Sequence, residues 1–461
     1  MDSIKSKVYS ILAEQFLVSQ DDLSDDIGPG DLPKWDSLGQ IQLIVELEKN
    51  FSFHFLVDEI MSINSVKDII QVVNKYQSDS QTESSDAIPS VQSLQSPLRH
   101  PSTTYWGSGS LNFLKNIDKN NVVLLTGKSE YAKVLQTRIR DLLKDRVVEI
   151  VERSSREPTE DDIILVAEQF RTHAPDAILA IGGGSTIDLA KLAWALYEHT
   201  DLDMDTLGRP FAIPNLGDKA KLIAVPTTFS GSEASSAATF NRRGSSNKTI
   251  ALSHEFIPDI VILDPELGEG LGIVDRFAGA FDALTHAIEG WVSVVNNPMV
   301  EPYALSAIRG ITNSLKLGAL DLDALCYGAF WAGIVQNHCS VGLTHSIAHQ
   351  LTGYGISHAK GTAAFLTPVM SYNNKNRNGV YDVLAKNLNF NSSESLIEAL
   401  SNLYQIENIM PSRESLESIL SNSTIIAESS MNDITFRTTP VSPSKEDIQS
   451  LIEITVKGYL E

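Results

Sequence analysis

Between residues 121 and 265, short aliphatic runs alternate with stretches of helical periodicity such as TEDDIILVAEQFRTHA. The runs are NVVLLTG (121–127), VVEIV (147–151), DAILAIGGG (176–184), KLIAVPTT (221–228) and DIVILDP (259–265). Alternation of strand and helix signals predicts a doubly wound, mostly parallel sheet, which we assign to an α/β domain over 101–266. After about Leu267 the strand signals stop and helical ones continue, so residues 267–461 are predicted to form an all-α domain.

Length and composition limit the class of protein. A chain of 461 residues is too long for one ordinary core, so we expect a multidomain protein. Its 42% hydrophobic and 20% charged residues suit a globular protein. We find no apolar run long enough to cross a bilayer and no charged-then-apolar leader sequence, so we expect a cytoplasmic protein without a membrane partner. A net charge of −22 repels phosphates, which argues against a nucleic acid partner. The two cysteines, Cys326 and Cys339, are expected to be buried free thiols.

Residues 1–77 form an acidic segment whose apolar residues recur at helical spacing in KVYSILAEQF, SLGQIQLIVELEKNF and SVKDIIQVVNKY. This pattern predicts a small all-α bundle of three or four helices. The loop DDIGPGDLPKWDSLG ends with Asp36, Ser37 and Leu38, where the second helix begins. Residues 78–100 have little apolar content and no periodicity, which predicts a flexible linker with a mean span of roughly 25 Å.

The tetrapeptide Trp35-Asp36-Ser37-Leu38, followed by IQLIVELEKNF, resembles an acyl carrier protein. The resemblance implies a four-helix carrier bundle whose serine, Ser37, bears 4′-phosphopantetheine. It also implies two kinds of partner, a phosphopantetheinyl transferase and pathway enzymes that dock the carrier. The alternative is that Ser37 only caps a helix, which serine favours. Gly39 is a departure from the carrier pattern, because glycine is a poor helix former.

Several potential metal ligands lie between residues 282 and 358. Asp282 and His286 are four apart in FDALTHAIEG, and His345 and His349 repeat that spacing in GLTHSIAHQL, so each pair faces one side of a helix. His358 follows TGYGIS, whose glycines allow the chain to turn back. One carboxylate and three imidazoles suit Fe²⁺ or Zn²⁺, and the absence of thiolate favours an open site. Solvated or core histidines are the alternative, although five of the ten histidines gather here.

A glycine stretch, GGGSTID, follows the apolar run DAILAI and opens a helical pattern. Glycine lets the backbone approach a pyrophosphate, and amides at a helix N-terminus bind its charge. The arrangement differs from the GxGxxG of the usual dinucleotide fold, and GGGS by itself is also compatible with an ordinary turn. Its position between strand and helix favours a nucleotide site.

Taken together, GGGSTIDLAK, PTTFSGSEAS, DPEL, DALTHAIEG and GLTHSIAHQL resemble the iron-containing alcohol dehydrogenase family, from about Tyr105 to near the C-terminus. The resemblance implies that NAD or NADP and Fe²⁺ or Zn²⁺ bind between a nucleotide-binding domain and a helical domain. It implies metal ligation by Asp282, His286, His345 and His358, with His349 as a catalytic group that either supports a ligand or relays a proton. The implied cofactor contacts are Gly183, Gly184, Ser185, Asp188, Thr227, Thr228 and Ser232.

Three departures from the family pattern bear on these assignments. Twelve residues separate His345 from His358, one fewer than the family spacing, so a gap-free alignment would put Ala359 at the ligand position. PTTFSGSE is similar to the maleylacetate reductase branch, which works without metal but lacks the carboxylate of Asp282. Gly127, in LLTGK, replaces the acidic residue of NAD-selective members. Without that negative charge the site can admit a 2′-phosphate, which favours NADPH over NADH. Gly127 is therefore expected to line the cofactor site.

The leading interpretation is an NAD(P)- and metal-dependent alcohol dehydrogenase or aldehyde reductase in a biosynthetic pathway. Its substrate is expected to be a small-molecule or carrier-tethered aldehyde or alcohol, and we expect a homo-oligomer. One alternative is a metal-independent reductase of the maleylacetate reductase type. The other is a carrier-protein scaffold fused to an inactive dehydrogenase module.

Overall fold

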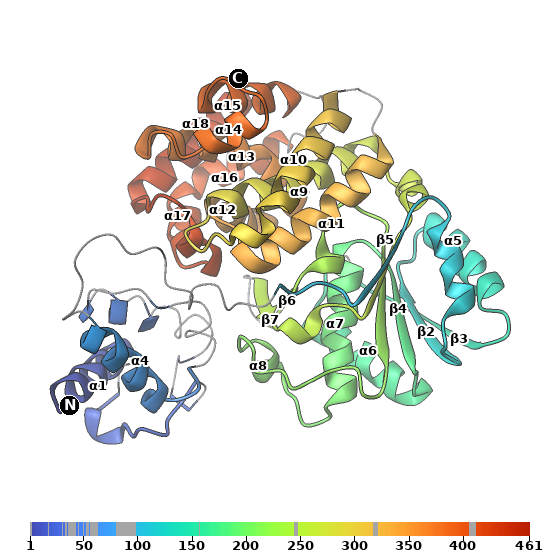
Figure 1. Cartoon of the computed structure of the whole chain (residues 1–461), viewed down its shortest axis with the longest axis horizontal. Helices are drawn as coiled ribbons and strands as arrows, with labels where there is room; N and C mark the ends of the chain where they lie inside the picture. Colours follow the sequence, from blue (N-terminus) through green and yellow to red (C-terminus); the bar gives the residue numbers. More distant parts are fainter. Residues whose placement is uncertain are drawn as a thin grey trace. The chain divides into compact units, whose positions relative to one another are not determined.

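The computed structural model describes residues 2–16, 18–29, 31–32, 35, 43–44, 46–48, 50–51, 55, 63–79, 98–155, 157–243, 248–316, 321–404 and 412–461 (Figure 1). The chain divides into two compact units. One consists of residues 1–98 with 205–212, and the other of residues 99–204 and 213–461.

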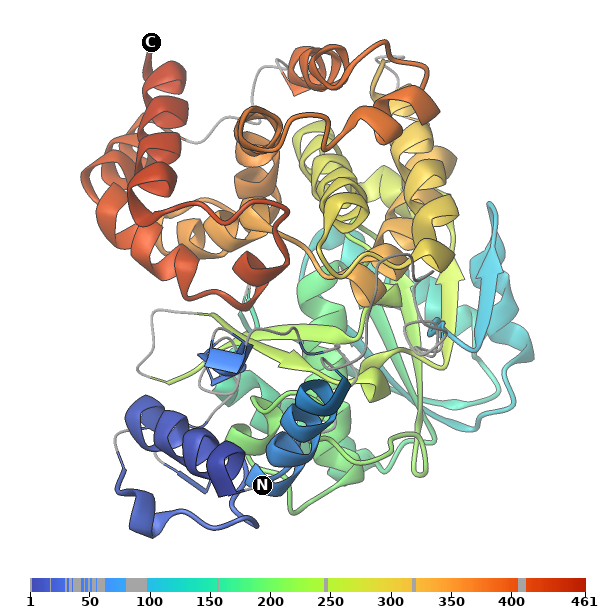
Figure 2. The same cartoon turned by 60° about the vertical axis from the view of Figure 1, so that its left-hand side comes forward.

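The larger unit begins with a six-stranded parallel sheet, which confirms the predicted α/β nucleotide-binding fold (Figures 1 and 2). The strands are β1 (Thr103–Trp106), β2 (Asn121–Thr126), β3 (Val147–Glu152), β4 (Ala177–Gly182), β5 (Lys221–Pro226) and β8 (Ile260–Leu263), in the order β1-β8-β5-β4-β2-β3. The helices of this half are α5 (Glu130–Leu142), α6 (Glu160–His173) and α7 (Gly184–Glu198), with short 3₁₀ turns η3 (Ser110–Asn116), η4 (Ser232–Ala234), η5 (His254–Phe256) and η6 (Pro265–Gly270). All but the first residue of helix α8 (Met204–Leu207) belong to the segment 205–212 of the smaller unit.

Two features of this half were not predicted from the sequence. The edge strand β1 reads TTYW and lacks an aliphatic run, yet it pairs in parallel with β8. Strands β6 (Ala237–Asn241) and β7 (Lys248–Leu252) form a separate antiparallel pair, and the burial of β6 alternates along its length. Strands β1 and β6 therefore depend on their partner strands rather than on a continuous buried run of residues.

From Ile273 onward, every regular element that the structure describes is a helix, as predicted (Figure 1). The helices are α9 (Ile273–Val292), α10 (Glu301–Lys316), α11 (Leu322–Cys339), α12 (Leu343–Leu351), α13 (His358–Asn376), α14 (Asp382–Asn387), α15 (Ser393–Tyr404), α16 (Arg413–Ser421), α17 (Ser423–Met431) and α18 (Lys445–Leu460), with 3₁₀ turns η7 (Pro298–Val300), η8 (Thr352–Tyr354) and η9 (Ile434–Thr438). Among the described residues, no helix is long and apolar enough to span a membrane. Cys326 and Cys339 are buried free thiols, as expected.

Helix α9 buries polar as well as apolar side chains inside the helical half. Its buried residues include Phe281, Leu284 and Ile288, as an amphipathic helix requires, but also Asp282 and His286. Burying polar groups is costly unless they find partners. The partners must come from the neighbouring helices, of which α11, α10 and α13 pack against α9.

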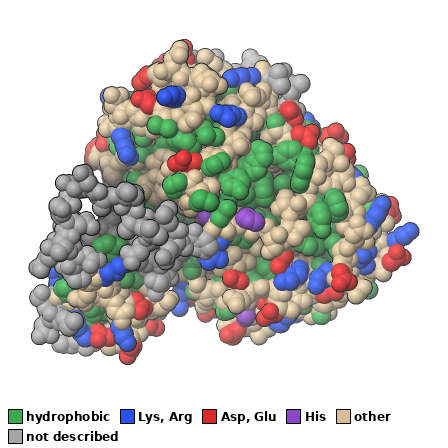
Figure 3. All heavy atoms as spheres, in the orientation of Figure 1, with side chains coloured by type: hydrophobic (Ala, Val, Ile, Leu, Met, Phe, Trp, Pro, Cys, Tyr) green, Lys and Arg blue, Asp and Glu red, His purple; other side chains and the backbone are tan. Residues whose placement is uncertain are grey.

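An apolar surface covers part of the larger unit. Figure 3 shows hydrophobic side chains gathered in the region of α11. Trp106 of β1 is 70% exposed, and its ring meets Tyr327 of α11 edge-on, with centroids 5.9 Å apart. Tyr327 in turn lies 6.4 Å from Trp331. An exposed aromatic group of this kind is typical of a contact surface.

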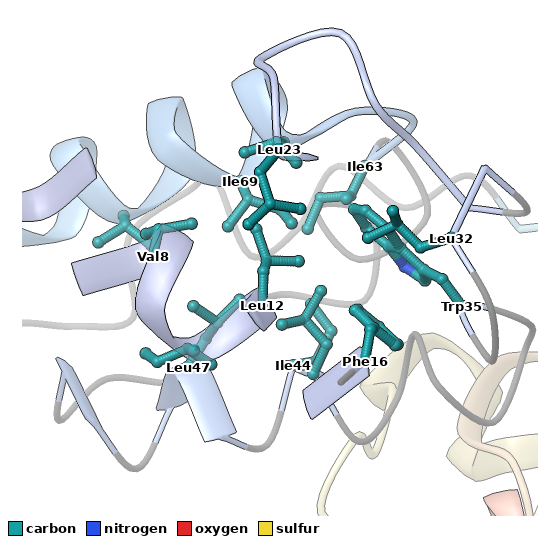
Figure 4. Packing of buried hydrophobic residues seen from close by; sticks show 14 of the residues in the cluster. Val8, Leu12, Phe16, Leu23, Leu32, Trp35, Ile44, Leu47, Ile63 and Ile69 are labelled. Carbon is teal, nitrogen blue, oxygen red and sulfur yellow. The ribbon is translucent and has the colours of Figure 1, made fainter. Parts of the chain in front are cut away.

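The smaller unit has its own hydrophobic core (Figure 4). Its described helices are α1 (Asp2–Phe16) and α4 (Val66–Asp79), with a 3₁₀ turn η1 (Gln20–Asp22). Trp35 is fully buried, and its ring stacks on Phe16 with centroids 5.0 Å apart. The remaining labelled core residues are Val8, Leu12, Leu23, Leu32, Ile44, Leu47, Ile63 and Ile69. Ser37 lies outside the described residues, so the carrier bundle and its attachment site remain predictions.

Candidate active site

Four predicted ligand side chains from three helices converge in the helical half. Asp282 and His286 lie one turn apart on α9, His345 lies on α12, and His358 opens α13. One potential ligand atom from each lies within 4.8 Å of the other three. Nε2 of His358 is 3.4 Å from Oδ1 of Asp282, and Nε2 of His345 is 3.7 Å from it. The histidine at this position is therefore His358, and Ala359 offers no side-chain donor.

The polar atoms of this group fit a divalent cation. Nδ1 of His286 and Nε2 of His345 are buried and have no hydrogen-bond partner within the described residues. Such orphaned buried groups are rare and destabilising unless something binds them. A carboxylate with three imidazoles and no thiolate suits Fe²⁺ or Zn²⁺ with an open coordination position.

Electrostatics favour the ligand forms of two members of the group. Burial disfavours the ionised carboxyl of Asp282, but His358, His286 and His345 outweigh it and keep its pKa well below the usual range. The hydroxyl of Thr362 also donates to Oδ1 of Asp282, at 3.0 Å. Burial lowers the pKa of His286 to about 4, so this imidazole is neutral and has a lone pair for a metal.

A buried carboxylate that the sequence analysis missed orients His345. Oε2 of Glu289 accepts from Nδ1 of His345 at 2.7 Å and from the backbone N–H of Gly342 at 2.8 Å, while Oε1 accepts from the N–H of Thr344 at 2.7 Å. Burial opposes a charge on His345, but the neighbouring carboxylates of Asp282 and Glu289 outweigh it and raise its pKa to about 9. Nε2 of His345 thus faces Asp282, while its Nδ1 faces Glu289. Glu289 is seven residues after Asp282 on α9, so both lie on one face of the helix. This spacing in the sequence could have identified Glu289 as part of the site.

We expect Glu289→Gln to weaken metal affinity by about 10- to 100-fold, because carboxylates behind a ligating histidine fix its ring and raise its basicity. A competitive chelator titration measures the change, with the thermal unfolding temperature as a check of the fold. The matched control is Glu417→Gln, since the carboxylate of Glu417 is exposed and pairs with Arg413 on the same helix, α16. Unchanged affinity in Glu289→Gln would show that His345 needs no such support.

His349 lies beside the four-residue group rather than in it. Its ring stacks on His358 with centroids 5.1 Å apart, and its Nδ1 is 2.8 Å from Oδ2 of Asp433. Oδ1 of Asp433 accepts from the N–H and the hydroxyl of Thr435, at 2.9 and 2.7 Å. Despite burial, His349 and Thr435 hold the pKa of Asp433 below its usual value. Because the carboxylate of Asp433 takes Nδ1 of His349, Nε2 is the ring nitrogen left to accept a proton, as a proton relay requires. Asp433 is a second residue that the sequence analysis missed.

The predicted cofactor residues lie at the carboxyl ends of neighbouring strands. Gly127 follows β2, Gly183 and Gly184 follow β4, and Thr227 and Thr228 follow β5. The strand order reverses between β2 and β4, because the chain passes from β2 outward to β3 and returns on the other side. Nucleotides bind at such switch points in doubly wound sheets.

The glycine turn after β4 is packed too tightly for side chains. A Cβ at Gly183 would lie 2.8 Å from Cγ2 of Thr228, and one at Gly182 would lie 2.6 Å from Oγ1 of Thr186. Helix α7 begins at Gly184, its N-cap Gly183 supplies no side-chain hydrogen bond, and Ser185 lies in the first turn. The first amides of α7 thus have no side-chain cap and suit an anionic phosphate.

The loop after β5 is tied to α7 by charged side chains. Oδ1 of Asp188 accepts from the hydroxyl of Ser232 at 2.7 Å, and Oδ2 accepts from the N–H of Thr239 at 3.0 Å. The ammonium of the fully buried Lys191 donates to the carbonyls of Ser232 and Ser235, both at 2.7 Å. Burial lowers the pKa of Lys191 to about 8. Asp188 and Ser232 therefore shape the loop together, and the role of Lys191 was not predicted.

Comparisons with known proteins agree with this fold. The family model described as iron-containing alcohol dehydrogenase matches residues 101–265, and that described as Fe-containing alcohol dehydrogenase family, C-terminal, matches residues 276–456. An NADPH-dependent butanol dehydrogenase of Clostridium saccharobutylicum is 29% identical over 78% of this chain and 97% of its own length. An alcohol dehydrogenase of Thermococcus barophilus is 28% identical over 75% of this chain and 95% of its own. The solved structure of an iron-containing alcohol dehydrogenase from Thermococcus thioreducens superposes with a TM-score of 0.72, at 26% identity, over 78% of this chain and 100% of that one. Neither family model covers residues 1–100.

Proposed function

The chain belongs to the iron-containing alcohol dehydrogenase family, and on that basis we propose that it is an NAD(P)- and metal-dependent alcohol dehydrogenase or aldehyde reductase. It is an oxidoreductase that acts on CH–OH groups. The convergence of Asp282, His286, His345 and His358 carries the proposal of a metal-dependent reaction. The loop after β5 approaches this group at Phe229, whose carbonyl oxygen lies 3.4 Å from the position of a Cβ on Gly279, one turn before Asp282 on α9.

The proposed mechanism uses the residues in distinct roles. The metal, when bound, supplies a Lewis acid for the substrate oxygen, and the nicotinamide exchanges a hydride with the substrate carbon. Asp282 contributes a fixed negative charge, and Glu289 keeps Nε2 of His345 directed at the site. His349, oriented by Asp433, would accept the hydroxyl proton during oxidation and return it during reduction. Burial of Asp282, His286 and His345 keeps water from competing for these contacts.

For the N-terminal unit we propose a carrier role, with 4′-phosphopantetheine on Ser37 and an aldehyde or alcohol substrate that is tethered to it or made from it. The separate core of this unit, with Trp35 buried two residues before Ser37, supports an independent domain. A polar linker of the length of residues 78–100 would keep a tethered substrate at an effective concentration of about millimolar near the site. Such a carrier would have a phosphopantetheinyl transferase and pathway enzymes as partners.

We expect a phosphopantetheinyl transferase with coenzyme A to add one arm to the protein and to Ser24→Ala, an exposed serine of the same unit, but not to Ser37→Ala. With about 10 μM enzyme, an aldehyde on the arm should be reduced about 10- to 100-fold faster in single turnover than the same aldehyde at equal concentration as a free thioester, because of the tether. Intact mass and NAD(P)H absorbance are the measurements. Addition to Ser37→Ala refutes the attachment site, and equal rates refute the coupling.

Two alternative functions make different predictions. A metal-independent reductase of the maleylacetate reductase type would keep its full rate after removal of divalent ions by a chelator. A carrier scaffold with an inactive dehydrogenase module would bind no NAD(P)H. Within the described residues, Nδ1 of His286 and Nε2 of His345 are buried without a hydrogen-bond partner, which favours the metal-dependent enzyme over the metal-independent reductase.

We also propose a homo-oligomer. The edge strand β1, the 70% exposed Trp106 and the neighbouring Tyr327 offer an apolar surface that would be covered by a second copy. Sedimentation of the wild type and of Trp106→Ser tests this, and a monomeric wild type would refute it.

A further inference from the structure

A cationic side chain lies directly over Gly127. Strands β2 and β3 are neighbours whose last residues, Thr126 and Glu152, are paired in register. Arg153 follows β3, and its backbone N–H donates to the carbonyl of Thr126 at 3.0 Å. Nε of Arg153 lies 3.9 Å from the position that a Cβ on Gly127 would occupy. The guanidinium group thus borders the space that the missing side chain leaves open.

Hydrogen bonds hold Arg153 and the acidic side chains near it in place. Nη1 of Arg153 donates to the carbonyl of Ser155 at 2.7 Å, which fixes the side chain across the strand ends. The acidic Asp162 nearby is occupied by the hydroxyls of Ser154, Ser155 and Thr159. The carboxylate of Glu152 is exposed and accepts from the amide of Gln136 at 3.0 Å.

The position within the sheet indicates which part of a dinucleotide would reach this corner. If the glycine turn after β4 binds the pyrophosphate, as the proposed function requires, the adenosine ribose lies over the end of the adjacent strand β2. An acidic side chain there would accept from the 2′-hydroxyl of NAD. Gly127 offers no such acceptor, and the neighbouring Arg153 offers a positive charge instead.

We propose that Arg153 is a specificity-determining residue that binds the 2′-phosphate of NADP(H) in the space left open by Gly127. This inference rests on the proposed dehydrogenase function. A guanidinium presents several N–H donors in one plane and binds phosphate oxygens by charge-assisted hydrogen bonds. NADP(H) would therefore bind more tightly than NAD(H), because only NADP(H) carries the 2′-phosphate that Arg153 contacts.

Binding titrations of the intact protein test this without relying on turnover. The wild type should bind 2′-AMP more tightly than 5′-AMP in calorimetry, and NADPH more tightly than NADH by fluorescence. Arg153→Gln should weaken binding of 2′-AMP and NADPH by about 10- to 100-fold, the size expected for lost charged hydrogen bonds, and change NADH affinity by less than about 3-fold. Arg153→Lys should retain part of the preference, and Gly127→Asp should reverse it in favour of NADH.

The controls separate this inference from the proposed function. Arg140→Gln removes an exposed arginine from α5 and should leave all four affinities unchanged. A wild type that binds both dinucleotides equally, or an Arg153→Gln variant that loses NADH and NADPH alike, would overturn the role of Arg153 and leave the dehydrogenase intact. A wild type that binds neither dinucleotide would overturn both.

Discussion

The His345→Ala variant is expected to lose its divalent metal and about 10³-fold or more of kcat, since a Lewis acid contributes several kcal/mol to the reaction barrier. His345 is 1% exposed, and its imidazole sits between Asp282 and Glu289. Removing it takes away one proposed ligand and also deprives the buried Glu289 of its imidazole partner. Elemental analysis of the purified protein and steady-state kinetics with NAD(P)H are the measurements.

A second variant separates loss of the metal from loss of stability. His286→Ala removes a proposed ligand whose Nδ1 has no hydrogen-bond partner among the described residues. This variant should therefore unfold at a temperature closer to that of the wild type than His345→Ala does. Both variants should be metal-free, whereas His173→Ala, in the last turn of α6, should keep one metal per chain. Full occupancy in either site variant would disprove the assigned ligand set.

The part of the site that follows from local spacing was predictable from the sequence. Asp282 and His286 share a face of α9 because residues four apart lie on one side of any helix, and the same holds for His345 and His349 on α12. The turn through Gly355, whose φ is +81°, returns the chain to this face, as the glycines before His358 suggested. Periodicity carries such information because it needs no knowledge of tertiary packing.

The supporting carboxylates depend on packing that periodicity does not encode. Asp433 lies 84 residues after His349, in a turn that packs on α12, and nothing in the sequence pairs the two. The same reason applies to β1, whose partner β8 is more than 150 residues away, and to Lys191, which serves backbone carbonyls. Backbone acceptors carry no sequence signal, so a buried lysine that binds them cannot be assigned from residue type.

Gly333→Ala is expected to destabilise the protein by about 3 kcal/mol, at the upper end of the range for overpacked sites, and to weaken nucleotide binding. A Cβ on Gly333 of α11 would lie 2.2 Å from the carbonyl oxygen of Gly231, and Gly231 itself has a φ of +80°. Two backbones meet here, and neither can move as a flexible side chain would. The turn η4, which begins at Ser232, would have to shift, and with it the carbonyl that accepts from Lys191.

The control for Gly333→Ala is Gly458→Ala, in the exposed part of α18, where an added Cβ meets nothing within 4 Å. That change should leave stability unchanged or raise it by up to about 1 kcal/mol, because alanine is the better helix former. Chemical denaturation of both variants gives the two free energies, and titration with NADPH shows whether the loop after β5 has moved. Wild-type stability in Gly333→Ala would mean that the backbones of Gly333 and Gly231 do not meet this closely in solution.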